Sequence, residues 1–184
     1  MREARGRTAL VAVASGALAS MITLGAQGRP KASIEVVLDA DGVHAGRSAR
    51  VALRVALPDG VHVQSDAPRD SFLIATAATV PPTAGVTVAE VVYPPATDFA
   101  QAGQSTPLTV FEQRFAIGLK LAIAPGTPAG ELQVPIQLRY QPCDATTCFA
   151  PAREQLTATL HVVPGSITPK PQFADLFNGL RFSR

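Results

Sequence analysis

Apolar and polar side chains alternate along the segment Leu132-Gln-Val-Pro-Ile-Gln-Leu-Arg-Tyr140, which places Leu132, Ile136 and Tyr140 on one face. A period of two residues is typical of a strand with one buried face and one face in water. Pro135 is unusual there, because proline has no N–H to donate to a neighbouring strand. We therefore expect a strand over 132–140 that has an open edge or a bulge at Pro135.

The same alternation returns at short intervals on both sides of this segment. Strong runs cover residues 50–57, 115–123 and 156–162, and weaker ones cover residues 33–38, 61–64, 72–75 and 86–92. Turns rich in the chain's 16 Pro and 14 Gly residues separate these runs. About eight short strands at such spacing predict an all-β chain folded as an antiparallel β-sandwich.

Two segments lack this period. Residues 93–107, YPPATDFAQAGQSTP, are predicted to form a long loop, and a loop of this length in a compact domain is often functional. The tail at 164–184 begins as a Pro/Gly linker. We expect it to be loosely held, with one short helical turn within 175–182.

The first 28 residues have the pattern of a secretory signal peptide. Three arginines within residues 1–7 precede an almost wholly apolar run over 8–25, and a small-x-small site follows at 26–28. The run is shorter than the ~20 apolar residues that a membrane anchor normally needs, which favours cleavage after Gly28. The alternative is an uncleaved anchor, and in both cases the rest of the chain is exported.

Loss of the signal changes the charge balance. Removing residues 1–28 takes three of the 16 basic and one of the 14 acidic residues, which leaves 13 of each. The formal charge of +2 therefore belongs to the signal. The remainder has no basic cluster, which argues against a nucleic-acid partner, and we expect no small-molecule cofactor.

The only two cysteines are Cys143 and Cys148. They lie between the expected strands 132–140 and 154–163, and therefore at the tip of a hairpin. Antiparallel neighbours have Cβ atoms ~4.5–5.5 Å apart, and a disulfide prefers ~3.5–4.5 Å. In an exported protein we expect this pair to be able to oxidise with modest adjustment.

Several roles are open to such a pair. As a structural staple it is weak, because a ring of six residues constrains the unfolded chain by only ~2 kcal/mol. As a redox pair it is well placed at an exposed hairpin tip. A metal site is disfavoured, because further ligands are missing nearby. Among the three histidines, His62 is flanked by valines and His161 alternates with apolar residues, so we interpret both as structural.

Three stretches carry a resemblance to a known family. Residues 139–153, RYQPCDATTCFAPAR, resemble the cysteine hairpin of the N-terminal periplasmic domain of DsbD-type thiol:disulfide interchange proteins. Residues 59–68, DGVHVQSDAP, resemble an early strand of that domain, and residues 93–99, YPPATDF, resemble its cap-loop region. Together they span most of residues 32–163.

This resemblance implies an immunoglobulin-like sandwich in the periplasm. It also implies a dithiol that receives electrons from a membrane-embedded thiol reductase. The electrons would pass to periplasmic thioredoxin-like proteins, such as disulfide isomerases or cytochrome c maturation thioredoxins. By position, Cys148 corresponds to the cysteine that engages the partner and Cys143 to the resolving one. Asp98 and Phe99 correspond to a cap that shields the pair from oxidants.

The sequence also departs from the family pattern. Four residues separate the cysteines where some members have five, and Phe149-Ala-Pro151 replaces a Tyr-Pro-Pro stretch. We expect that no membrane bundle or thioredoxin-like domain follows. We therefore expect a signal at 1–28, a stand-alone domain at 29–163, and a linker and tail at 164–184. The alternative function is an exported partner-binding module whose disulfide clamps a loop.

Overall fold

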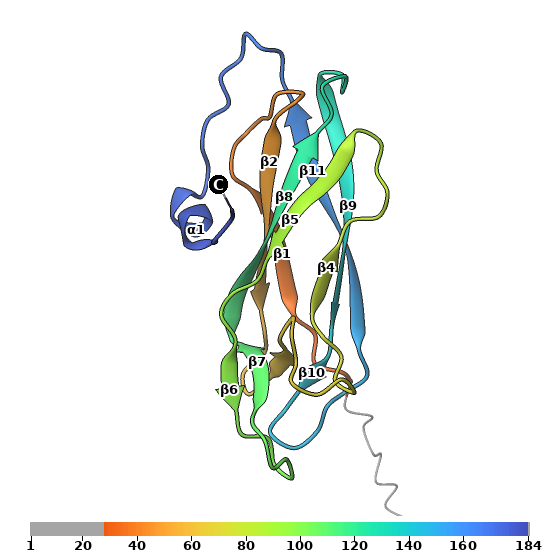
Figure 1. Cartoon of the computed structure of the whole chain (residues 1–184), viewed down its shortest axis with the longest axis vertical. Coiled ribbons are helices and arrows are strands. Elements are labelled where there is room, and N and C mark those ends of the chain that lie inside the picture. The colour runs from red at the N-terminus through yellow and green to blue at the C-terminus, as the bar shows by residue number, and fades with distance from the viewer. Residues whose placement is uncertain (1–27, 184) are drawn as a thin grey trace, which may run out of the picture.

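The computed structural model describes residues 28–183 of the chain (Figure 1). The expected signal peptide at 1–28 lies, apart from its last residue, outside the described residues. Within 28–183, no helix is long and apolar enough to cross a membrane.

The described residues form eleven strands and one short helix. In chain order these are β1 (Ser33–Leu38), β2 (Ser48–Ala56), β3 (His62–Gln64), β4 (Ala77–Thr79), β5 (Val86–Val92), β6 (Thr97–Phe99), β7 (Leu108–Glu112), β8 (Arg114–Ile123), β9 (Gly130–Tyr140), β10 (Pro142–Cys143), β11 (Ala152–Val162) and α1 (Ala174–Gly179).

The strands form three sheets, and all pairs of named strands are antiparallel. The first has the order β1-β2-β8-β5 and the second has the order β11-β9-β4. The third, β10-β3-β7-β6, is built from short strands, and Figure 1 shows β6, β7 and β10 at one end of an elongated molecule. The predicted antiparallel β-sandwich is confirmed.

The core lies between the first two sheets. Alternating residues of β8, including Leu119 and Leu121, are fully buried and belong to one cluster with Val134 and Ile136 of β9. Each such side chain stabilises the fold by about 1.5–3 kcal/mol when it leaves water. The long strands with the clearest period of two therefore supply the rigid frame that carries the short third sheet.

The structure explains the proline inside β9. On one side β9 pairs with β11, where Pro135 lies opposite Thr157. On the other side β4 is short and reaches only from Gln137 to Arg139. At Pro135 the strand therefore has a neighbour on one side only, which confirms the expected open edge.

Two sequence-based expectations for short segments are wrong. Residues 72–75 do not form a strand, and Phe72 is 90% exposed. The strand in this region is β4, whose Ala78 pairs with Leu138. The segment 93–107 is not wholly a loop, because it contains β6, which pairs with β7. Short strands form where a longer neighbouring strand has a free edge, and their own sequences show little alternation of apolar and polar residues.

The C-terminal tail is docked on the sandwich, so the expectation of a loosely held tail is wrong. Figure 1 shows α1 beside the sheet that contains β1 and β2. Phe177 of α1 is 1% exposed and packs with Val37 and Ala52 on the outer face of those strands. The Arg50 guanidinium lies 5.4 Å from the centre of the Phe177 ring. The outer face of this sheet is therefore partly apolar and covered.

Candidate functional site

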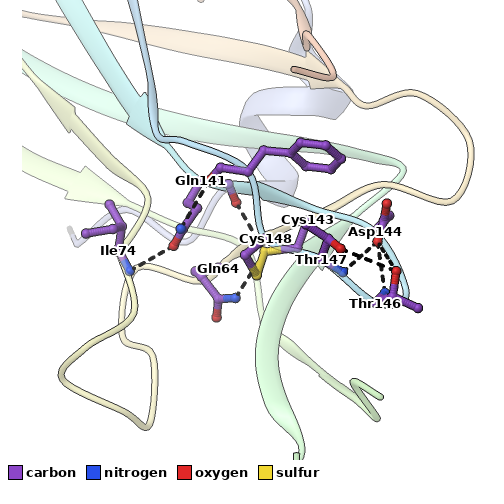
Figure 2. The surroundings of a disulfide bond; sticks show 9 residues. Gln64, Ile74, Gln141, Cys143, Asp144, Thr146, Thr147 and Cys148 are labelled. Atoms are coloured by element: carbon purple, nitrogen blue, oxygen red, sulfur yellow. Dashed lines mark hydrogen bonds between the residues drawn. A yellow bond between two sulfur atoms is a disulfide. The ribbon is translucent and has the colours of Figure 1, made fainter. Parts of the chain in front are cut away.

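The two cysteines lie in the connection between β9 and β11, at the end of the molecule formed by the third sheet. Cys143 belongs to β10, where it pairs with His62 of β3. Cys148 follows a tight turn, and the two cysteines form a disulfide with their Cα atoms 4.0 Å apart (Figure 2). The expected hairpin position and the expected ability to oxidise are both confirmed.

The two sulfur-bearing residues differ in exposure. Cys143 is fully buried, with 0% of its surface exposed, and Cys148 is exposed. The buried Gln64 amide nitrogen donates to the Cys143 sulfur at 3.6 Å. Thiol–disulfide exchange needs direct attack on a sulfur atom, so accessibility decides which one reacts first. An incoming protein can reach the Cys148 side of the bond, and the Cys143 side is enclosed.

Asp144 shapes the turn between the cysteines. Its Oδ1 accepts hydrogen bonds from the backbone N–H groups of Thr146 at 2.8 Å and Thr147 at 2.7 Å. This is the pattern by which aspartate stabilises a turn. The two bonds hold the pKa of the Asp144 carboxyl below its ordinary value. The turn therefore carries a stable negative charge next to Cys143.

Two loops hold the cysteine hairpin in place. The Gln141 side chain donates to the Phe149 carbonyl at 3.2 Å. It also accepts from the Ile74 N–H at 3.3 Å, as Figure 2 shows. On the other side, the Ala102 N–H donates to the Ala145 carbonyl at 3.2 Å. The hairpin is therefore tied to the loop before β4 and to the loop after β6.

His62 is the titratable group beside the buried cysteine. It is 1% exposed, and its ring centre lies 4.0 Å from that of Phe99. Burial lowers the pKa of His62, and the charges of Glu112 and Asp144, with the nearby Gln101 amide, act against that shift. Among the described residues, no partner has hydrogen-bond geometry to either ring nitrogen.

The other predicted site residues lie on β6. Phe99 packs on the ring of His62, and His62 is the register partner of Cys143. Asp98 is exposed and forms an ion pair with Arg69 at 2.7 Å. Arg69 also donates to the Pro107 carbonyl at 2.7 Å. The structure thus brings Phe99 into the surroundings of Cys143 and fixes Asp98 to the loop after β3.

Three polar residues around the site were not singled out as functional from the sequence. His62, Gln64 and Gln101 are all buried, and each has a side-chain polar atom without a hydrogen-bond partner in the described chain. The available signal was the stretch 59–68, which contains the first two. Within residues 28–183, no three side chains of His, Cys, Asp or Glu gather as a metal site requires.

Comparison with known proteins agrees with this geometry. Residues 35–160 match the family model for the thiol:disulfide interchange protein DsbD, N-terminal. The chain belongs to this family. Its antiparallel sandwich is thus the immunoglobulin-like fold expected of a DsbD N-terminal domain. Membership implies redox partner proteins in general. No curated protein is similar enough to count as a match.

Several solved structures resemble this DsbD N-terminal family member. The reduced DsbD N-terminal domain of Neisseria meningitidis is 15% identical, with 71% of this chain and 90% of that chain covered and a TM-score of 0.45. The N-terminal periplasmic domain of ScsB from Proteus mirabilis is 14% identical, with 73% of this chain and 49% of that chain covered and a TM-score of 0.48.

Proposed function

We propose that this chain is a periplasmic thiol:disulfide exchange protein. Its cysteine pair would relay electrons from a membrane-embedded thiol reductase to thioredoxin-like proteins, such as disulfide isomerases or proteins of cytochrome c maturation. The observation that carries the proposal is the unequal exposure of Cys143 and Cys148 in a member of a thiol:disulfide interchange family.

The exchange proceeds in two steps that conserve electrons. In the reduced protein, the Cys148 thiolate attacks one sulfur of the partner's disulfide, and the partner's other sulfur leaves as a thiolate. The Cys143 thiolate then attacks the Cys148 sulfur, which re-forms the internal disulfide and releases the partner's second thiol. Two electrons have passed to the partner, and the dithiol of the membrane reductase restores them by the same two steps in reverse.

The electrostatics favour activation by docking. The four residues between the cysteines include no Lys, Arg or His that would lower a thiol pKa. The one charge in the turn is the Asp144 carboxylate, which opposes formation of a second negative charge nearby. Reaction of Cys148 therefore depends on what a bound partner contributes, which protects the free protein from unwanted exchange.

Phe99 and Asp98 are proposed to act as the cap. The Phe99 ring covers His62, the register partner of Cys143. The Asp98–Arg69 ion pair fixes the strand from which Phe99 projects. The Ala102–Ala145 hydrogen bond joins the following loop to the cysteine hairpin. Such a cap limits the access of small oxidants and has to shift when a partner docks.

Export and domain division belong to the same proposal. The pattern at 1–28 supports a signal peptide and hence a periplasmic location. The exchange domain is proposed to span 29–163, with 164–184 as a linker and tail that folds back onto it. The packing of Phe177 supports treating that tail as part of the same folded unit.

The alternative function is a partner-binding module in which the disulfide only clamps the loop. The hydrogen bonds of Gln141 and the turn at Asp144 favour it, because they show a hairpin organised as a rigid surface. The two functions differ in whether the disulfide opens during the working cycle. They can therefore be separated by chemistry at the sulfur atoms.

A trapping experiment tests the proposed function. Cys143→Ser keeps the exposed thiol and removes the resolving one, so the variant should accumulate a mixed disulfide with an oxidised thioredoxin. The matched control is Cys148→Ser, which should trap little or none because its remaining thiol is buried. Circular dichroism checks that both variants are folded. Equal trapping by both folded variants, or by neither, would contradict the proposal.

A further inference from the structure

His62 lies opposite the buried Cys143 in the β3–β10 pair but has no part in the two exchange steps described above. Residues i and i+2 of a strand point to the same face, so His62 and Gln64 share one face of β3. The Gln64 amide reaches the Cys143 sulfur at 3.6 Å. Cys143 is also the register partner of His62 across the β3–β10 pair. The imidazole and the Cys143 thiol therefore belong to the same side of the third sheet.

The second exchange step makes a chemical demand on Cys143. Only a thiolate attacks a disulfide at a useful rate, and a thiol has an ordinary pKa of about 8.5 that rises when it is buried in apolar surroundings. Cys143 is fully buried, and the Asp144 carboxylate next to it opposes a second negative charge, although the Gln64 amide donates to the sulfur. In the mixed disulfide it would therefore remain a thiol at neutral pH, unless a neighbouring group accepts its proton.

We propose that His62 accepts the proton of Cys143 during resolution of the mixed disulfide. This inference rests on the proposed function. The Cys143 S–H bond breaks and its proton moves to a free ring nitrogen of His62. The new thiolate attacks the Cys148 sulfur, and the bond between Cys148 and the partner breaks, with its electron pair leaving on the partner's thiolate. The proton then passes from the imidazolium to solvent or to the departing thiolate.

The surroundings of His62 suit this role. Neither ring nitrogen has a partner in full hydrogen-bond geometry among the described residues. The Gln101 side chain lies close enough to act on the pKa of His62 as a hydrogen-bond partner would, which engages at most one of the two nitrogens. At least one ring nitrogen is therefore free, although buried polar groups are hydrogen-bonded in about 90% of cases or more. Burial also keeps the pKa of His62 below its ordinary value. The ring is therefore neutral and able to accept a proton at neutral pH.

The charges around the ring stabilise the imidazolium once it forms. Glu112 is the register partner of His62 on β7, and Asp144 acts on it from the cysteine hairpin. A cavity of ≈ 460 Å³ lies beside the ring, and its lining also includes Asp59 and the one cation, Arg114. Phe99 and Gln101 complete the enclosure with uncharged groups. The cavity gives the proton a route to solvent.

A two-phase reaction with 5,5′-dithiobis(2-nitrobenzoate) tests the inference. The reduced protein releases one coloured thiolate when Cys148 attacks the reagent and a second when Cys143 resolves the mixed disulfide. His62→Phe should leave the first phase unchanged. It should slow the second by about tenfold or more at neutral pH, with a further fall of about tenfold per pH unit toward acid, because the rate then follows the Cys143 thiolate fraction. The wild-type second phase should stay nearly flat above the His62 pKa.

Controls separate this inference from the proposed function. His62→Gln also lacks a base and should show the same slow, pH-dependent second phase, which keeps the test valid if the Phe variant folds poorly. His161→Phe replaces an exposed histidine on β11 and should change neither phase. A second phase with the wild-type pH profile in a folded His62 variant would overturn the inference. Loss of the second phase in the wild type itself would instead contradict the resolving role of Cys143.

Discussion

The cysteine hairpin at 141–151 and the C-terminal segment at 164–183 both lie outside the long strands, and they are held by different forces. The C-terminal segment is fixed by apolar burial, with Phe177 at 1% exposure against the sheet. Hydrogen bonds add to this, such as that from the Gln172 N–H to the Asp39 carbonyl at 2.7 Å. The hairpin is fixed by hydrogen bonds from Gln141, Ala102 and the Asp144 turn. The C-terminal segment buries the Phe177 ring, and the hairpin leaves Cys148 exposed.

The same two regions differ in how well their buried polar atoms are satisfied. His62, Gln64 and Gln101, around the cysteine hairpin, each hold a buried polar atom without a partner. In the described part of the C-terminal segment there is no such atom. Natural proteins tolerate such unsatisfied groups mainly where function requires them. We therefore expect substitutions in the C-terminal segment to change mainly the free energy of unfolding, and those at the cysteine end to change mainly thiol–disulfide exchange.

The largest expected effect on stability is in the C-terminal segment. Phe177→Ala removes a fully buried aromatic ring and leaves a cavity, so the free energy of unfolding should fall by about 3–5 kcal/mol. Denaturant titration measures this loss. Phe72→Ala is the matched control, because that ring is 90% exposed and its loss should cost less than about 0.5 kcal/mol. The thiol–disulfide exchange rate of folded Phe177→Ala should equal that of the wild type. A slower rate would show that the C-terminal segment contributes to exchange and not only to stability.

Removal of the disulfide should have a smaller effect on stability. The double variant Cys143→Ser/Cys148→Ser opens a ring closed by residues five apart in sequence. Its free energy of unfolding should fall by about 2 kcal/mol, because such a small ring restricts the unfolded chain only modestly. The same denaturant titration applies. A loss larger than that of Phe177→Ala would favour the loop-clamp function over exchange.

The smallest expected effect is a pH dependence at the Asp144 turn. The pKa of Asp144 in the folded protein lies below its ordinary value of 3.8. Its carboxylate therefore adds stability above that pH, and this stability is lost as the pH falls through the lowered pKa. Asp144→Asn should lose this part of the pH dependence, which unfolding curves between about pH 2 and 6 detect. Identical acid profiles would show that the turn does not depend on the charge.

The sequence predicts the frame of the sandwich well and the short elements poorly. β2, β8, β9 and β11 contain long runs of alternating residues, and the structure extends each run by only a few residues. β4, β6, β7 and β10 have two to five residues each. Their formation depends on a neighbouring edge, as with Ala78 opposite Leu138. Such pairing is a tertiary property that local sequence does not carry.

The candidate site was also predictable in part. The hairpin position of Cys143 and Cys148 follows from the two flanking strands. The neighbours of Cys143 do not, because His62 and Gln64 are far from it in sequence and meet it only through the third sheet. Gly118 of β8 gives a similar lesson for the tail. A Cβ atom added there would lie 2.5 Å from the Phe182 ring, so only glycine leaves room for the tail. The alternation in β8 predicts that Gly118 faces water, but the tail covers it.

The reduction potential of the Cys143–Cys148 pair tests the central claim most directly. The protein is equilibrated with graded glutathione or dithiothreitol redox buffers, and alkylation followed by mass spectrometry gives the reduced fraction. An exchange pair should have a potential between about −270 and −120 mV, in the range of thioredoxin-like carriers. A potential below about −300 mV is typical of a structural disulfide. That result would contradict the exchange function and leave the pair as a clamp.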